Sequence, residues 1–393
     1  DSSFAGATTA QGNADGNGKG DFYYAPPSGF LALCTSNLPA PVATVDPNEG
    51  GSPQDYFNTL LWTGNAGTDR AISGLDFTPD LVWVKERTST SEHQLTDSVR
   101  GVTKRLHSST TGAETTSTNS ILSFNTDGFN IGNSGAFNAN GDTYASWSWK
   151  AGGSGVSNTD GSITSTVSAN ADTGFSIVSY TGTGSDGATV GHGLSSAPEL
   201  AIIKGRDAGY PWMVMGYPTN TSFPNDGSFL TLSTTDAMGN GTGSEISIGS
   251  STMTFVDAGG NICESSRDYI AYCFHSVDGY SKIGSYTGNG NADGTFVYTG
   301  FRPAFTMIKQ SSGAGESWIM QDNKRSPQNV VVIESEANNA ATEYSSDTAA
   351  GYRIDYLSNG FKIRNTNVNW NESGSTYIYM AFAEQPFKYS NAR

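Results

Sequence analysis

Three short patterns of apolar and polar residues recur along this chain, more than 100 residues apart. In the first, an apolar stretch ends in an aromatic residue followed by Thr-Gly, at Trp62, Tyr180 and Tyr286. In the second, an apolar run separates a Pro from a Lys six positions later, at Lys85, Lys204 and Lys309. Each run predicts a strand that starts at the Pro, because proline need not donate to the ladder there. We expect each Lys to leave its strand at the surface.

A third pattern closes each unit with a Tyr followed by apolar residues, mostly aromatic, at offsets of three and five. The three sets are Tyr144, Trp147 and Trp149; Tyr269, Tyr272 and Phe274; and Tyr377, Met380 and Phe382. The spacings of 119 and 105 residues between successive lysines of the second pattern exceed those of solenoid or propeller repeats, so each copy can own a core. With about seven to nine short strands per copy, the sequence predicts an all-β protein of three tandem jelly-roll or lectin-like β-sandwich domains.

The predicted domains cover residues 54–153, 172–280 and 281–393. Residues 154–171 begin as a Ser/Gly linker and then alternate Thr, Ser and Val like a connecting strand. The second and third domains meet without a linker, and we expect them to pack as a rigid pair. Helical periodicity is sustained nowhere over three turns; residues 97–106 come nearest, which allows at most one short helix there.

Residues 1–53 differ from the repeat and hold too few apolar residues to fold alone. Their pattern predicts a Gly-rich loop, a short aromatic strand, a Pro-Pro turn, a second strand from Phe30 to Cys34, and a Pro-rich linker over 39–53. Such a segment is typical of the end of a domain whose body lies upstream. Because the chain begins at Asp1 rather than Met, we expect a processed product or the C-terminal part of a longer polypeptide.

Composition and charge narrow the possible partners. The 48 Gly are spread along the chain and aromatic residues make up 11% of it, which favours short strands and turns. The net charge of −16 disfavours nucleic acid and anionic membranes, because phosphate recognition needs clustered Lys and Arg. The sequence has no apolar window of about 18 residues that would predict membrane insertion. Whether Cys263 and Cys273 form a disulfide stays open, although Cys273 lies in a strand pattern typical of a buried apolar residue.

Several segments resemble large bacteriophage virion proteins that are common in marine phages. Residues 20–34 and 37–39 are similar to the closing segment of their SPRY-like sandwich domains. The repeat that follows in those proteins is similar to residues 79–85, 93–97, 99–101 and 147–153. Such proteins are usually described as tail-fibre or other tail-associated proteins. The resemblance implies a virion location, other virion proteins as partners, host surface polysaccharide as a target, and a homotrimer, although no heptad pattern supports the trimer.

Patterns that indicate catalysis are scarce. The four histidines share no metal-ligand spacing, and the chain has no GxSxG nucleophile elbow. Asp97 with Arg100 and Asp322 with Arg325 recur at one offset, but Gly216 replaces the acid in the second unit, so an internal ion pair that braces a turn explains the pattern. We therefore predict a non-enzymatic tail fibre or tail-associated protein for host-surface glycan attachment. The alternatives are a capsid-bound fibre or decoration protein, and a polysaccharide depolymerase that uses two carboxylates across a groove.

Calcium is the ion that the sequence favours. Asn13, Asp15 and Asn17 alternate oxygen donors with small residues, and residues 138–142 and 289–293 offer similar loops. None of these loops completes the calcium-binding pattern with its bidentate acid. The alternative is turn formation, since Asn, Asp and Gly tolerate left-handed backbone.

Aromatic side chains that break the repeat are the candidate glycan-binding residues. They are Trp212, Trp318 and Trp370. Trp212 and Trp318 align with His93 in the strand after the Lys, so packing in a core or between domains is the alternative for these two. Trp370 lies between two asparagines in what the sequence predicts to be a polar loop, and it is the leading candidate.

Overall fold

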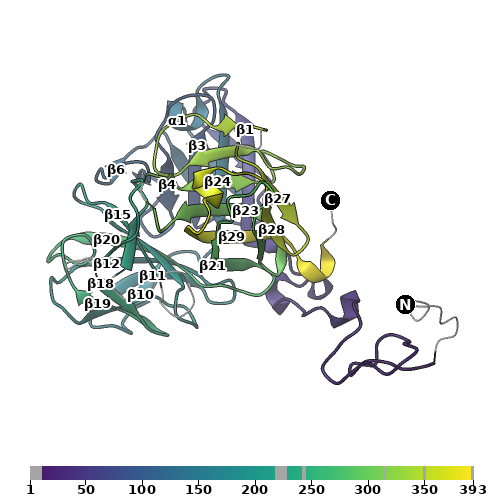
Figure 1. Cartoon of the computed structure of the whole chain (residues 1–393). Coiled ribbons are helices and arrows are strands. Elements are labelled where there is room, and N and C mark those ends of the chain that lie inside the picture. Colours follow the sequence, from purple (N-terminus) through teal and green to yellow (C-terminus); the bar gives the residue numbers. More distant parts are fainter. Residues whose placement is uncertain (1–10, 217–227, 241–244, 314, 348–350, 391–393) are drawn as a thin grey trace.

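The chain folds almost entirely into antiparallel β-sheets in the computed structural model (Figure 1), which describes residues 11–216, 228–240, 245–313, 315–347 and 351–390. Within these ranges every repeat contributes nine strands in the same order. The prediction of an all-β protein is confirmed. None of the helices in the described ranges has the length and apolar character needed to cross a bilayer.

Each repeat pairs a larger sheet with a three-stranded one. In the first repeat the larger sheet has the order β1 (Phe57–Thr63), β9 (Thr143–Trp149), β3 (Leu81–Glu86), β4 (Gln94–Asp97). The smaller sheet has the order β2 (Arg70–Ser73), β8 (Gly128–Ile131), β7 (Ile121–Asn125). The short strands β5 (Lys104–Arg105) and β6 (Thr115–Thr116) pair with each other, and a bridge from Leu95 to Leu106 joins them to β4.

The same order recurs in the other two repeats. The second has β12 (Phe175–Thr181), β20 (Asp268–Phe274), β14 (Leu200–Gly205), β15 (Trp212–Gly216), β16 (Ser228–Thr231), β17 (Gly239–Asn240), and then β13 (Ala188–Gly191), β19 (Thr252–Asp257), β18 (Glu245–Ile248). The third has β21 (Ser281–Thr287), β29 (Thr376–Pro386), β23 (Phe301–Gln310), β24 (Ile319–Asp322), β25 (Ile333–Glu336), β26 (Tyr344–Ser345), and then β22 (Phe296–Tyr298), β28 (Gly360–Ile363), β27 (Ile354–Leu357). The sequence patterns therefore mark one fold built three times.

The first and third sequence patterns recur together because their aromatic residues are cross-strand partners. Trp62 lies opposite Tyr144, Tyr180 opposite Tyr269, and Tyr286 opposite Tyr377, with stacked rings whose centroids are 5.4, 5.3 and 5.0 Å apart. Each closing Tyr also donates its hydroxyl to the backbone carbonyl nine residues upstream, at 2.6 to 2.8 Å. These ring pairs lie in the separate core between the two sheets of each repeat.

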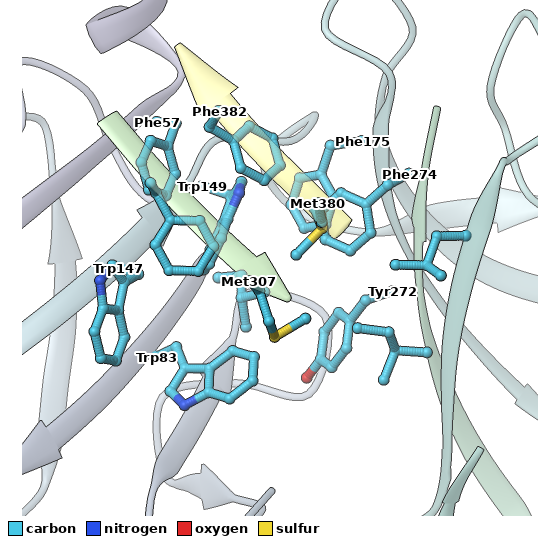
Figure 2. Close-up of a cluster of buried hydrophobic side chains, with 14 of the residues drawn as sticks. Phe57, Trp83, Trp147, Trp149, Phe175, Tyr272, Phe274, Met307, Met380 and Phe382 are labelled. Atoms are coloured by element: carbon cyan, nitrogen blue, oxygen red, sulfur yellow. The ribbon is translucent and has the colours of Figure 1, made fainter. Parts of the chain in front are cut away.

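The other face of each larger sheet is buried as well, in a fourth core that all three repeats share (Figure 2). The first repeat contributes Trp83, Trp147 and Trp149, the second Tyr272 and Phe274, and the third Met307, Met380 and Phe382. Because both faces are covered, β3 and β14 are buried along their whole length. Each repeat thus has a core of its own, as its length allowed, and the shared core is what distinguishes the structure from the expected string of autonomous units.

Three equivalent hydrogen bonds join the repeats in a closed ring. Trp212 Nε1 of the second repeat donates to the His107 carbonyl of the first (2.8 Å), and Trp318 Nε1 of the third donates to the Thr231 carbonyl of the second (3.0 Å). His93 Nε2 of the first repeat lies 3.0 Å from the Glu336 carbonyl of the third. The third repeat therefore contacts the first as closely as consecutive repeats contact each other.

The lysines of the second pattern are fully buried, so the prediction that they reach the surface is wrong. Lys204 Nζ donates to the carbonyls of Gly205 (2.7 Å) and, in the first repeat, Thr111 (3.1 Å). Lys309 Nζ reaches the Thr235 carbonyl of the second repeat (3.3 Å). Since burial strips water from the ammonium groups, the pKa of Lys85, Lys204 and Lys309 falls to about 8.

The structure refines several local predictions, inside and outside the repeats. Residues 154–171 hold β10 (Val156–Asn158) and β11 (Ser165–Asn170), which extend the larger sheet of the second repeat into eight strands. Residues 97–106 form no helix: a turn over 98–103 joins the end of β4 to β5. In the described ranges the α-helices are α1 (Gly135–Asn138) and α2 (Val368–Asn371). Short 3-10 helices lie at Thr35–Asn37, Ala43–Val45, Pro47–Glu49, Pro53–Asp55 and Phe387–Tyr389.

The N-terminal segment extends away from the ring before it docks on it (Figure 1). The predicted strand from Phe30 to Cys34 is absent; the pairing before residue 53 in the described chain is a single bridge from Asn13 to Phe22. Residues 39–53 are no free linker, because Val45 is fully buried in the shared core. All three cysteines are free thiols, and Cys273 is buried as predicted.

Replacing Lys204 by Met tests the buried ammonium groups. A folded-state pKa of about 8 lies below the unfolded value of 10.5, so the unfolded chain holds the proton more tightly between these values and stability rises with pH across this window. We expect the free energy of unfolding of the wild type, relative to Lys204→Met, to increase from pH 8 to 10 by up to about 1.4 kcal/mol per pH unit. Urea unfolding at several pH values measures this difference. The exposed Lys324→Met is the control: if the wild type gained as much stability with pH relative to Lys324→Met as relative to Lys204→Met, the explanation would be contradicted.

Candidate functional site

The three tryptophans proposed as glycan platforms are all buried. Trp212 and Trp318 lie in the shared core, where their indole N–H groups bind neighbouring repeats, as the packing alternative predicted. Trp370 lies on α2 inside the core of the third repeat, with its ring centroid 4.7 Å from that of Tyr352. The prediction of an exposed Trp370 is therefore wrong, and none of the three indoles offers a face to a ligand.

The polar loop around Trp370 misled the prediction because its asparagine is structural. Asn371 Oδ1 accepts from the Asn289 backbone N–H (2.9 Å), and its Nδ2 donates to the Asn365 carbonyl (2.8 Å). Asn138 on α1 bonds the Asn65 N–H in the same way (2.9 Å). The asparagine thus ties the helix to the turn after the first sequence pattern. The side chain of the residue before the asparagine therefore lies in the core.

The candidate calcium ligands form a hydrogen-bonded turn. The Asp15 carboxylate accepts from the backbone N–H groups of Ala32, Lys19 and Asn17 and from Asn37 Nδ2, at 2.6 to 2.9 Å. Burial alone would raise its pKa, but these donors lower the pKa of Asp15 to about 2. Asn13 presents its Nδ2 to the Phe22 carbonyl. In the part of the chain that the structure describes, no three His, Cys, Asp or Glu residues are grouped to hold a metal.

The two recurring Asp-Arg pairs are internal ion pairs that brace a turn, as predicted. Arg100 Nε lies 2.5 Å from Asp97 Oδ2, and Arg325 Nε lies 2.6 Å from Asp322 Oδ2, with all four side chains buried. The acid also accepts the backbone N–H of its own Arg at 2.8 Å in both pairs.

Each acid also binds the adjacent repeat. The Tyr272 hydroxyl of the second repeat donates to Asp97 (2.8 Å), and Trp147 Nε1 of the first donates to Asp322 (3.2 Å). At the joint between the second and third repeats, Gly216 occupies the position of the acid and Met380 that of the donor. Donor and acceptor are lost together, so neither is left buried without a partner.

A second set of ion pairs follows the same rule. Arg206 of the second repeat forms a two-pronged pair with Glu114 of the first (3.0 and 3.1 Å), and Arg87 of the first pairs likewise with Glu343 of the third (2.7 and 2.8 Å). At the remaining joint the equivalent residues meet only through the backbone, where Met238 N–H donates to the Ser311 carbonyl (2.9 Å). Two joints therefore carry this ion pair, and the joint between the second and third repeats carries a backbone hydrogen bond in its place.

The four histidines contact backbone carbonyls, and His93 does so at the joint that closes the ring. Trp83 Nε1 donates to His93 Nδ1 (2.8 Å), so His93 carries its hydrogen on Nε2, toward the Glu336 carbonyl. His107, His192 and His275 lie 2.9 to 3.1 Å from carbonyl oxygens. These histidines are part of the scaffold.

A surface pocket lies between the third repeat and both terminal segments, and sequence reasoning missed it. Its volume is about 160 Å³, and it is lined by Pro39, Ala40, Pro41, Asp278, Gly279, Lys282, Tyr298, Thr299, Gly300, Pro386 and Phe387. Gly279 has φ +79°, and a Cβ there would lie 2.4 Å from the Pro41 Cβ, so only glycine lets the two segments meet. The pocket draws on residues more than 340 positions apart, which no local pattern predicts.

Acid should weaken the joint that His93 closes. Protonation would set an Nδ1 hydrogen against the Trp83 N–H, and burial, with Lys85 and Arg325 nearby, holds the pKa of His93 well below 6.5. The unfolded chain therefore takes up the proton first, and stability is lost as pH falls below 6.5. The variant His93→Gln retains a donor and an acceptor but cannot take up this proton. We expect its free energy of unfolding to fall by up to about 1.4 kcal/mol less per pH unit than that of the wild type. Urea unfolding at pH 7, 6 and 5 tests this, with the partly exposed His275→Gln as control; parallel losses would contradict it.

One family comparison covers nearly all of this architecture. The sequence model of a domain of unknown function, DUF7483, matches residues 52–386, from just before β1 to the end of β29. Neither the curated proteins nor the solved structures contain a significant match to the chain. The match treats the three repeats as one unit, in keeping with their shared core. The chain therefore belongs to the DUF7483 family.

Proposed function

We propose that this chain is a non-enzymatic structural module of a phage virion, in a tail fibre or tail-associated protein, that attaches to glycans on the host surface. One observation carries the proposal: the ionisable side chains that recur between repeats are used to join the repeats. Asp97 and Asp322 are held by arginines inside the ring, and Lys204 is enclosed by carbonyls. Recognition is thereby left to surface residues that differ between the repeats.

We extend the proposal to the fold class and assign each repeat to the jelly-roll or lectin-like sandwiches. Support comes from the two antiparallel sheets of every repeat, which enclose a core of their own. Other virion proteins are the proposed structural partners. The homotrimer stays a prediction that light scattering can test. Within a single chain, three equivalent sheets already meet at the shared core.

A binding assay with purified bacterial envelope polysaccharides tests the proposed function. We expect the labelled chain to bind at least one polysaccharide. Size-exclusion chromatography should show that the length of this polysaccharide is unchanged. Shortened polymers with new reducing ends would overturn the non-enzymatic assignment in favour of a depolymerase. Electron microscopy of phage particles labelled with an antibody against the chain tests the location: we expect label on the tail, and label on the capsid would favour the decoration protein.

A further inference from the structure

Two exposed aromatic residues on β22 break the repeat. Phe296 is 43% exposed and Tyr298 is 55% exposed, on either side of the buried Val297. Val297, Ile72 and Val190 are equivalent, because each faces the same position of the neighbouring strand in its small sheet. The residues that flank them are Ala71 and Ser73 in the first repeat and Thr189 and Gly191 in the second. Only the third repeat therefore carries large rings at these positions.

The fold keeps these rings uncovered. β22 is an edge strand of its sheet, so β28 is its single hydrogen-bonded neighbour there. Gly360 lies directly opposite Tyr298, and a Cβ at Gly360 would lie 2.0 Å from the Val297 carbonyl oxygen, so position 360 cannot carry a side chain that covers this ring. Lys362 lies opposite Phe296 and is held by Asp293 at 2.6 Å. An exposed aromatic edge is a liability for a soluble protein unless it binds something.

One of the two aromatic residues, Tyr298, also borders the pocket between the third repeat and the terminal segments. Tyr298 lines it, with Pro41, Pro386 and Phe387 as apolar walls. Lys282, Asp278 and Thr299 add an ammonium, a carboxyl and a hydroxyl group. Among the described residues, no carboxylate lies within 4.0 Å of the Lys282 ammonium. The Thr299 hydroxyl donates to the Phe301 carbonyl (2.8 Å) and keeps its lone pairs to accept. The pocket therefore combines polar groups of both charges with a hydrophobic wall.

We propose that Phe296, Tyr298 and this pocket form a saccharide-binding site, which deepens the proposed attachment function and rests on it. Aromatic rings bury the apolar face of a sugar, while the ammonium, carboxyl and hydroxyl groups bond its hydroxyls. The volume of about 160 Å³ lies below the roughly 300–1,000 Å³ of pockets that hold drug-sized ligands, which suits one sugar ring rather than an extended peptide. The two rings, about 6.6 Å apart along the strand, extend the contact to a neighbouring sugar.

Binding to a glycan array of bacterial surface oligosaccharides, followed by titration of the glycans that bind, tests the site. We expect Tyr298→Ala and Phe296→Ala each to weaken binding at least about tenfold, as loss of a stacked ring does. The matched control is Tyr344→Ala, which removes a 54% exposed tyrosine of the same repeat outside the pocket. Circular dichroism establishes that the variants fold.

The outcomes separate the site from the function. Glycan binding that survives in both ring variants would overturn the site and leave the attachment function standing. A wild-type chain that binds no glycan on the array would overturn both. Binding of a Pro-rich peptide, or self-association, that is lost in Tyr298→Ala while glycan binding is unchanged would reassign the rings to a protein contact and overturn the saccharide proposal.

Discussion

The architecture depends on one constraint: the larger sheet of every repeat is apolar on both faces. A sheet with two apolar faces needs two covers. The small sheet of the same repeat covers one face and closes a separate core. The other two repeats cover the second face, and three such sheets satisfy one another only when the third meets the first. The closed ring follows from this requirement.

The joints show how polar groups are admitted to such an interior. A buried charge is tolerated when it is paired and hydrogen-bonded. Two joints carry an acid, its arginine and a donor from the next repeat; the third joint has Gly216 and Met380 in place of the acid and the donor. The divergence of the repeats is therefore correlated across their contacts. A position that appears to be lost from one repeat can be explained by its partner in the next.

Much of the fold could be predicted from the sequence, because its signals are local. The aromatic residue before each Thr-Gly and the closing Tyr are partners on paired strands, and their constant offsets revealed the repeat. The residues that cover the second face of a larger sheet come from distant parts of the sequence. Leu81–Glu86 has the same apolar run whether a small sheet or another repeat lies against it, so the shared core and the burial of Lys85 could not be predicted.

The candidate site was harder to predict for a related reason. A tryptophan between asparagines is typical of an exposed loop. Here, however, the side-chain amide of Asn371 forms hydrogen bonds with backbone groups, and Trp370 lies in the core of the third repeat. The exposed rings of Phe296 and Tyr298 were open to detection, since they break the repeat at aligned positions. Finding them required the register of β22 against β28, which the sequence patterns alone did not provide.

Native-state hydrogen exchange of the closing strands β9, β20 and β29 tests the shared core most directly. Trp149 packs against Phe274 of the second repeat and Phe382 of the third, with ring centroids 6.4 and 5.7 Å apart. If the repeats share one core, Trp149→Ala should lower the opening free energy of all three strands together, by about 3–5 kcal/mol. A loss confined to β9, with β20 and β29 protected as in the wild type, would contradict the account.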